Sequence, residues 1–168
     1  LPSPVLEYSP GGLASLLIHE LAHGTVFFKN AVEFNESLAE FIGNQGAQEF
    51  LTRHFGADSP ELREFKDDLL HEKEVAAVFK ELYDRLNALY LGEQDAPTKL
   101  KLREEHFIRG AQRLGAVSGR DMREPLNNAV ILAHRIYHND LSDFSRAYER
   151  SGRDWEKLAE HAHVLMNK

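Results

Sequence analysis

The sequence of 168 residues contains no cysteine. This absence excludes disulfide bonds, thiolate zinc sites, iron–sulfur clusters and cysteine nucleophiles. A metal ion bound to this chain would therefore take its ligands from histidine nitrogen atoms and carboxylate oxygen atoms.

Long apolar runs are also absent. No stretch of about eighteen apolar residues occurs, so no segment is expected to span a bilayer. The start of the chain carries no cationic leader, so the chain as it stands is not expected to begin with a signal peptide.

Basic residues are fewer than acidic residues. The 20 lysines and arginines face 27 aspartates and glutamates, which gives a net charge of -7. No basic stripe is present to overcome the repulsion of phosphate, so we expect no nucleic acid partner.

Strand signals are missing too. Valine, isoleucine and threonine form no alternating runs, and no Asn-Gly or Asp-Gly hairpin turn occurs. The length favours one domain over residues 1–168. We therefore predict an all-α fold, with helices over residues 13–28, 33–55, 60–90, 98–114, 125–137, 141–150 and 154–167.

The predicted helices differ in character. The first is apolar on most sides, which predicts burial. Gly43 and Gly46 are expected to loosen the second helix. The two long central helices are expected to pair as an antiparallel hairpin, and "GAVSGRDM" is expected to break the pattern after them.

The first predicted helix contains the sequence "HELAH". His19 and His23 stand at i and i+4, which places both imidazoles on one helix face about 40° apart. Two such nitrogens can hold one Zn²⁺ ion. Glu20 lies about 100° around the helix from His19, a position that suits a general base better than a third ligand.

Catalytic zinc takes a third protein ligand and keeps one open position. Glu36 can supply that ligand, because it follows His23 across a connection short enough for the chain to reverse. Glu40, one turn beyond Glu36, can accept the second N–H of a zinc-bound histidine. Asn35 can order the bend between the two helices.

Two other metal arrangements stay open. Glu160, His161 and His163 near the end of the chain can form a second metal patch, although an exposed helix face is the simpler interpretation. Together with Glu20 and His23 they also match the paired Glu-x-x-His motifs of helical di-iron proteins. Against that interpretation, His19 would have no role and Glu36 follows too soon for a separate long helix.

The residues around "HELAH" and "FNESLAEFIG" resemble the gluzincin metallopeptidases, in which HExxH is followed by a glutamate-bearing helix. The stretch "NESLAEF" is similar to the corresponding helix of the aminopeptidase N family. The chain is most similar to a bacterial family described as predicted aminopeptidases, which carry HELAH, FNExxA and an NNA…Y segment. Here that last segment is "NNAVILAHRIY" (Asn127–Tyr137).

The resemblance implies a zinc-dependent peptide hydrolase in which His19, His23 and Glu36 are the ligands and Glu20 is the base. It implies a peptide substrate, a bacterial source, and a chain that is the C-terminal part of a longer protein. The compartment stays open between cytoplasm and cell envelope. The GxMEN motif of aminopeptidase N is absent, which leaves exopeptidase and endopeptidase activity both open.

Peptide hydrolysis also needs a donor that stabilises the developing oxyanion. Tyr137 is the predicted donor because it ends the NNA…Y segment, with His134 one turn before it. Asn127 and Asn128 are expected to cap this helix, with binding of the substrate backbone as the alternative. The other candidate donors are Tyr8, Tyr83, Tyr90, Tyr148 and His138. A module that holds metal or peptide without turnover remains the alternative to an enzyme.

Overall fold

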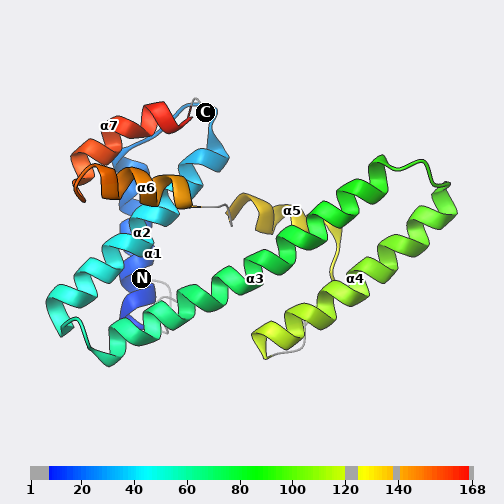
Figure 1. Ribbon diagram of the computed structural model, residues 1–168, viewed down its shortest axis with the longest axis horizontal. Helices are drawn as coiled ribbons and strands as arrows, with labels where there is room; N and C mark the ends of the chain where they lie inside the picture. The colour runs from blue at the N-terminus through cyan, green and yellow to red at the C-terminus, as the bar shows by residue number, and fades with distance from the viewer. Residues whose placement is uncertain (1–7, 120–124, 138–140, 167–168) are drawn as a thin grey trace. The chain divides into compact units, whose positions relative to one another are not determined.

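We describe a computed structural model of the chain, which covers residues 8–119, 125–137 and 141–166. The described residues form helices and no strand, which confirms the all-α prediction (Figure 1). The helices are α1 (Pro10–Thr25), α2 (Val32–Phe55), α3 (Pro60–Leu91), α4 (Ala96–Ser118), α5 (Asn128–Tyr137), α6 (Ser142–Arg150) and α7 (Trp155–Met166).

The helix boundaries follow local capping chemistry. Ser9 accepts a hydrogen bond from the backbone N–H of Gly12, so α1 begins three residues before its predicted start. Asp95 caps α4 in the same way through Thr98. The predicted break after α4 comes late, because "GAVS" stays helical and the chain leaves the helix at Gly119, whose φ of 64° is left-handed.

The chain divides into two compact units, Leu1–Asp67 with Asn139–Lys168 and Asp68–His138. In the first unit, α6 and α7 pack against α2 through an aromatic-rich core. Phe41 contacts the rings of Phe144, Tyr148 and Trp155. The buried members of this core are Phe28, Leu38, Phe41, Phe144, Tyr148, Leu158 and Ala162.

The second unit contains α3 from Asp68 onward, α4 and α5. α3 and α4 form a long hairpin and run antiparallel in Figure 1, with α5 beside them. Its seam is hydrophobic: Leu82 and Leu86 of α3 pack with Phe107 and Leu114 of α4 and Ile131 of α5. Exposed ion pairs flank the seam, including Glu81 with Arg113 across the hairpin. Asn127 caps α5, as predicted, by accepting from the backbone N–H groups of Ala129 and Val130. Asn128, the other predicted cap, is the first residue of α5, and its side chain accepts from the Tyr90 hydroxyl at 2.8 Å.

Two expectations about the first two helices are wrong. α1 is not buried on most sides: Leu17 and Leu21 are 44% and 70% exposed, since the helix packs by its other face on α2. Gly43 and Gly46 do not loosen α2, which continues unbroken through both. Both glycines instead face α1, where a side chain would meet neighbouring atoms.

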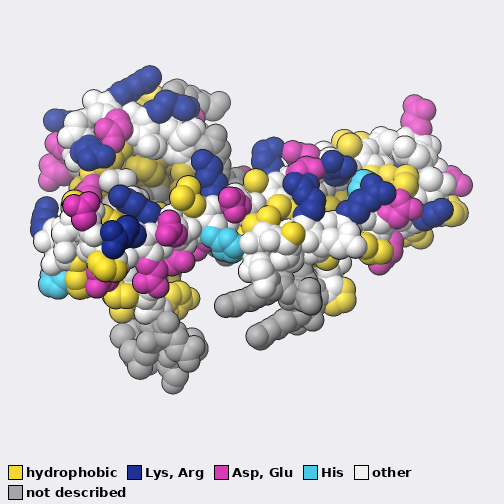
Figure 2. Space-filling view, turned by 60° about the horizontal axis from the view of Figure 1, so that its bottom comes forward, with side chains coloured by type: hydrophobic (Ala, Val, Ile, Leu, Met, Phe, Trp, Pro, Cys, Tyr) yellow, Lys and Arg dark blue, Asp and Glu magenta, His cyan; other side chains and the backbone are white. Residues whose placement is uncertain are grey.

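No helix among the described residues is long and apolar enough to cross a membrane. On the face shown in Figure 2, basic and acidic side chains are interspersed rather than gathered by sign.

Candidate metal centre

The contact between α1 and α2 is unusually close. A Cβ atom added to Gly43 would lie 2.7 Å from the carbonyl oxygen of Ser15 and 3.2 Å from Cβ of His19. The Ser15 hydroxyl donates to Oδ1 of Asn44 at 2.8 Å. Because glycine has no side chain, the two backbones approach closely here, and His19 is brought up against α2.

Asn35 holds the connection between α1 and α2. Its amide accepts from the backbone N–H of Phe28 at 2.9 Å and donates to the carbonyl of Phe28 at 2.8 Å. The Asn35 side chain is buried, so these bonds are shielded from water and satisfy both polar groups of Phe28. Asn30, in the same connection, adopts a left-handed φ of 62°, which asparagine tolerates better than most residues. The chain therefore reverses in a way that directs the start of α2 towards His19 and His23.

The reversal brings together one carboxylate and two imidazoles. Nε2 of His19 lies 3.1 Å from Nε2 of His23. The Glu36 carboxylate reaches Nε2 of His19 at 3.5 Å and Nε2 of His23 at 3.6 Å. One ligand atom from each of the three residues lies within 4.8 Å of the others. Their side chains are 22%, 27% and 23% exposed, so solvent and an ion can reach them.

These separations fit the geometry of a zinc site. Ligands about 2.0–2.1 Å from a tetrahedral zinc ion are about 3.3 Å from one another. The 3.1 Å between the two imidazole nitrogens is close to that value. The two separations from Glu36 are slightly longer and involve different oxygens, 3.5 Å from Oε2 to His19 and 3.6 Å from Oε1 to His23. Two imidazole nitrogens and one carboxylate oxygen are also a donor set that zinc accepts, with a fourth position left for water. Among the described residues, this is the one group of three or more metal-ligating side chains.

A family model described as "Putative aminopeptidase" matches residues 1–168. The chain belongs to this family. Neither a curated protein nor a solved structure gives a significant match to it. The match to the aminopeptidase family covers both units of the chain. The hairpin of α3 and α4 is therefore part of the region that the family shares, as is the helix that carries the two histidines.

Glu20 and Glu40, which were also predicted for the site, lie on α1 and α2. Glu20 is exposed on α1, directly after His19. Glu40 is partly buried on α2, one turn beyond Glu36. Their predicted roles as general base and as partner of a ligand histidine stay predictions.

Tyr137 ends α5 in the second unit, and its side chain lies outside the described residues, as does His138. Three of the other candidate donors have partners elsewhere. Tyr148 donates to Glu49 at 2.7 Å, Tyr90 donates to Asn128 at 2.8 Å, and His134 stacks on Phe79 with ring centroids 3.7 Å apart. Of the last two candidates, Tyr83 packs against the hairpin core and Tyr8 is exposed just before α1.

The residues near the C-terminus form no second metal group within the described part of the chain. Nδ1 of His161 lies 2.8 Å from the backbone carbonyl of Lys157. His163 packs edge-on against Phe28. Neither the second metal patch nor the paired di-iron arrangement is assembled among these residues.

Sequence reasoning missed the residues that set the close approach of α1 and α2. Gly43 and Ala47 are both buried and stand at i and i+4 on α2, which is a stripe of small residues on one helix face. That spacing was the available signal for a close contact between backbones. This signal was overlooked because a glycine inside a helix also lowers the stability of the helix, and Gly43 was interpreted in that way.

Proposed function

We propose that this chain is a zinc-dependent peptide hydrolase, with His19, His23 and Glu36 as the metal ligands. The observation that carries the proposal is the convergence of two imidazole nitrogens and one carboxylate oxygen within 4.8 Å. Membership of the aminopeptidase family supports peptide as the substrate class. Zinc, when bound, supplies Lewis acidity for the scissile carbonyl and lowers the pKa of a water molecule.

Glu20 is the general base of the proposed mechanism. It follows His19 on α1 and is exposed, so its carboxylate is accessible to water and to a bound peptide. It takes a proton from the attacking water and then delivers that proton to the leaving amine. A carboxylate serves both steps because it returns to its starting charge after the second transfer.

Glu40 and Asn35 support the ligands in this proposal. Glu40 accepts a hydrogen bond from the ring N–H of a ligand histidine, which selects the tautomer that presents the other nitrogen. Asn35 holds the connection at Phe28 and so keeps the start of α2 beside His23. Tyr137 is proposed as the donor to the oxyanion.

The proposal is tested by metal analysis and by cleavage of a peptide library, with free and with blocked N-termini. One zinc per chain and chelator-sensitive cleavage are expected. Cleavage of free N-termini alone would define an aminopeptidase, and cleavage of blocked peptides an endopeptidase. Metal without cleavage of any peptide would instead favour a non-catalytic binding module, and two irons per chain would end the zinc proposal.

Glu20→Gln separates chemistry from metal binding. The variant is expected to keep zinc and to lower kcat/KM by about 100-fold or more, because the amide cannot accept the proton. Normal turnover by Glu20→Gln would remove Glu20 from the mechanism.

A further inference from the structure

The first unit contains a polar cavity apart from the histidine cluster. Its volume is about 510 Å³, and it is lined by Gln45, Gln48, Glu49, Thr52, Arg53, Lys66, Tyr148 and Arg153. The cavity is largely open to solvent, and its three cationic side chains are exposed. None of its lining residues belongs to the proposed metal centre.

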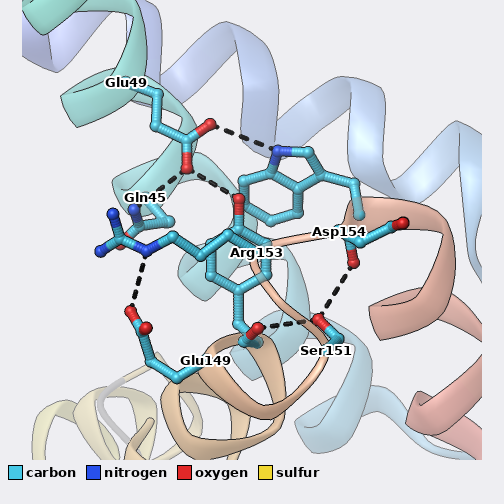
Figure 3. A network of polar contacts seen from close by, with 8 residues as sticks. Gln45, Glu49, Glu149, Ser151, Arg153 and Asp154 are labelled. Carbon is cyan, nitrogen blue, oxygen red and sulfur yellow. Dashed lines mark hydrogen bonds and ion pairs between the residues drawn. The ribbon is translucent and has the colours of Figure 1, made fainter.

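The cavity is lined by three cations and one carboxylate, and the carboxylate is already satisfied. Figure 3 shows Glu49 turned towards its donors. Tyr148 donates to Oε1 of Glu49 at 2.7 Å, the Gln45 amide donates to the same oxygen at 3.2 Å, and the Trp155 indole N–H donates to Oε2 at 3.4 Å. Burial and the bond to Glu49 raise the pKa of Tyr148, so its hydroxyl remains a donor.

The cations differ in what they already bind. Arg153 uses its Nε–H on Glu149 at 3.0 Å. Within the described part of the chain, Arg53 and Lys66 have no hydrogen bond or ion pair. The hydrogen-bond donors of the cavity that have no partner among the described residues are therefore charged: the five N–H groups of Arg53 and the three of Lys66.

Arg153 is held at the cavity by an uncommon backbone turn. It has a left-handed φ of 62°, directly after Gly152 with φ of 73°. Its backbone N–H donates to the carbonyl of Tyr148 at 3.0 Å, which ties the turn between α6 and α7 to the cavity wall. Among residues other than glycine, such backbone is sparsely populated and persists where surrounding contacts maintain it.

We propose that this cavity binds the oxyanion group of a small ligand, a phosphate or a carboxylate, through Arg53, Lys66 and Arg153. Arginine presents paired N–H groups that match two oxygens of either anion, and lysine adds a point charge. The Glu49 carboxylate keeps its negative charge, which the three cations of the lining outnumber, and its oxygens are already hydrogen-bonded by Tyr148, Gln45 and Trp155.

The test is calorimetric titration of the full chain with inorganic phosphate and, separately, with succinate at constant ionic strength. We expect saturable binding of one of the two. Tighter phosphate binding would assign a phosphorylated ligand, and tighter succinate binding would assign a carboxylate ligand. Saturable binding of neither anion overturns the proposal.

Arg53→Gln and Lys66→Gln are each expected to weaken that binding by about tenfold, the effect of losing one charge-assisted hydrogen bond. Arg63→Gln is the matched control, because Arg63 is an exposed cation of the same unit that does not line the cavity. An equal loss in Arg63→Gln would mean that only net charge matters, and would overturn the site.

A further variant tests whether the anion binds at the cavity or at the proposed zinc centre. Glu36→Gln removes a proposed metal ligand and no cavity residue, so anion affinity should be unchanged. Loss of anion binding in Glu36→Gln would place the anion at the metal centre and overturn the cavity assignment. Failure of peptide cleavage in the wild-type protein would leave the cavity result unaffected.

Discussion

The two units pair their helices in different ways. In the first unit, α1 and α2 meet at Gly43, where a Cβ would lie 2.7 Å from the Ser15 carbonyl oxygen. In the second, α3 and α4 meet through large side chains, with Leu82 packed over Gly110 and bounded by Phe107 and Leu114. Backbone contact leaves little freedom of position, whereas leucine side chains adjust. The helix pair with the close backbone contact is the one that assembles the metal-ligating side chains.

The largest expected effect is on zinc affinity, and it distinguishes Glu36 from Glu40 on α2. Glu36→Gln should weaken zinc binding by more than about 100-fold, because a proposed ligand is removed, whereas Glu40→Gln should cost about 10–100-fold. Competition titration with a zinc chelator measures both. Equal and small losses would move the third ligand to another residue.

The next prediction concerns the hydrophobic seam of the hairpin. Leu82 is buried in it, so Leu82→Ala should lower the free energy of unfolding of the second unit by about 2–5 kcal/mol. Amide hydrogen exchange should show lost protection in α3 and α4 while protection in α1 and α2, and the zinc affinity, stay unchanged. A matching loss of zinc affinity would show that the two units do not behave separately.

A pair of glycine substitutions tests the comparison directly. Gly43→Ala places a methyl group against backbone, so we expect a loss of about 1–3 kcal/mol and weaker zinc binding as His19 moves away from Glu36. Gly110→Ala is the matched control: its methyl group meets Cδ2 of Leu82 at 2.7 Å, the end of a side chain that can shift. We expect no change in zinc affinity for that variant. Thermal unfolding and chelator competition measure both variants, and equal effects on zinc would remove the special role of the α1–α2 contact.

The smallest expected effect lies on the surface of the hairpin. Hydrogen bonds from Arg113 and Arg85 lower the pKa of the Glu81 carboxyl. A lowered acid pKa adds stability above the ordinary value of 4.5, and that stability is lost as the pH falls through the folded-state pKa. Arg113→Gln should therefore cause a slight loss at pH 7 that vanishes in acid and shrinks in high salt. Urea unfolding at both pH values measures it, and a loss that grows in acid would contradict the assignment.

Local sequence was sufficient for most of the fold. Apolar spacing placed all the described helices, and ends marked by Ser9, Asp95 and Asn127 follow short-range capping. The late end of α4 escaped prediction because Gly115 continues the helix whereas Gly119 ends it, and the two glycines are alike in sequence.

The candidate metal site was predictable because its elements are close in the chain. His19 and His23 share a helix face by periodicity alone, and Glu36 follows after one short connection. The polar cavity was not predictable, because the Glu49 carboxylate meets Tyr148 and Trp155, 99 and 106 positions away. No local pattern carries the information that these side chains meet.

The sequence by itself determined the helical class and the exclusion of thiol chemistry. It also determined the identity of the histidine and glutamate groups on α1 and α2, because each depends on residue type and helical period. Only the tertiary structure decided that α1 and α2 approach at Gly43, that Asn35 holds Phe28, and that Glu36 lies 3.5 Å from His19 and 3.6 Å from His23. The physical reason is that distances of this kind depend on how two helices pack, which is the combined result of many contacts rather than of any one motif.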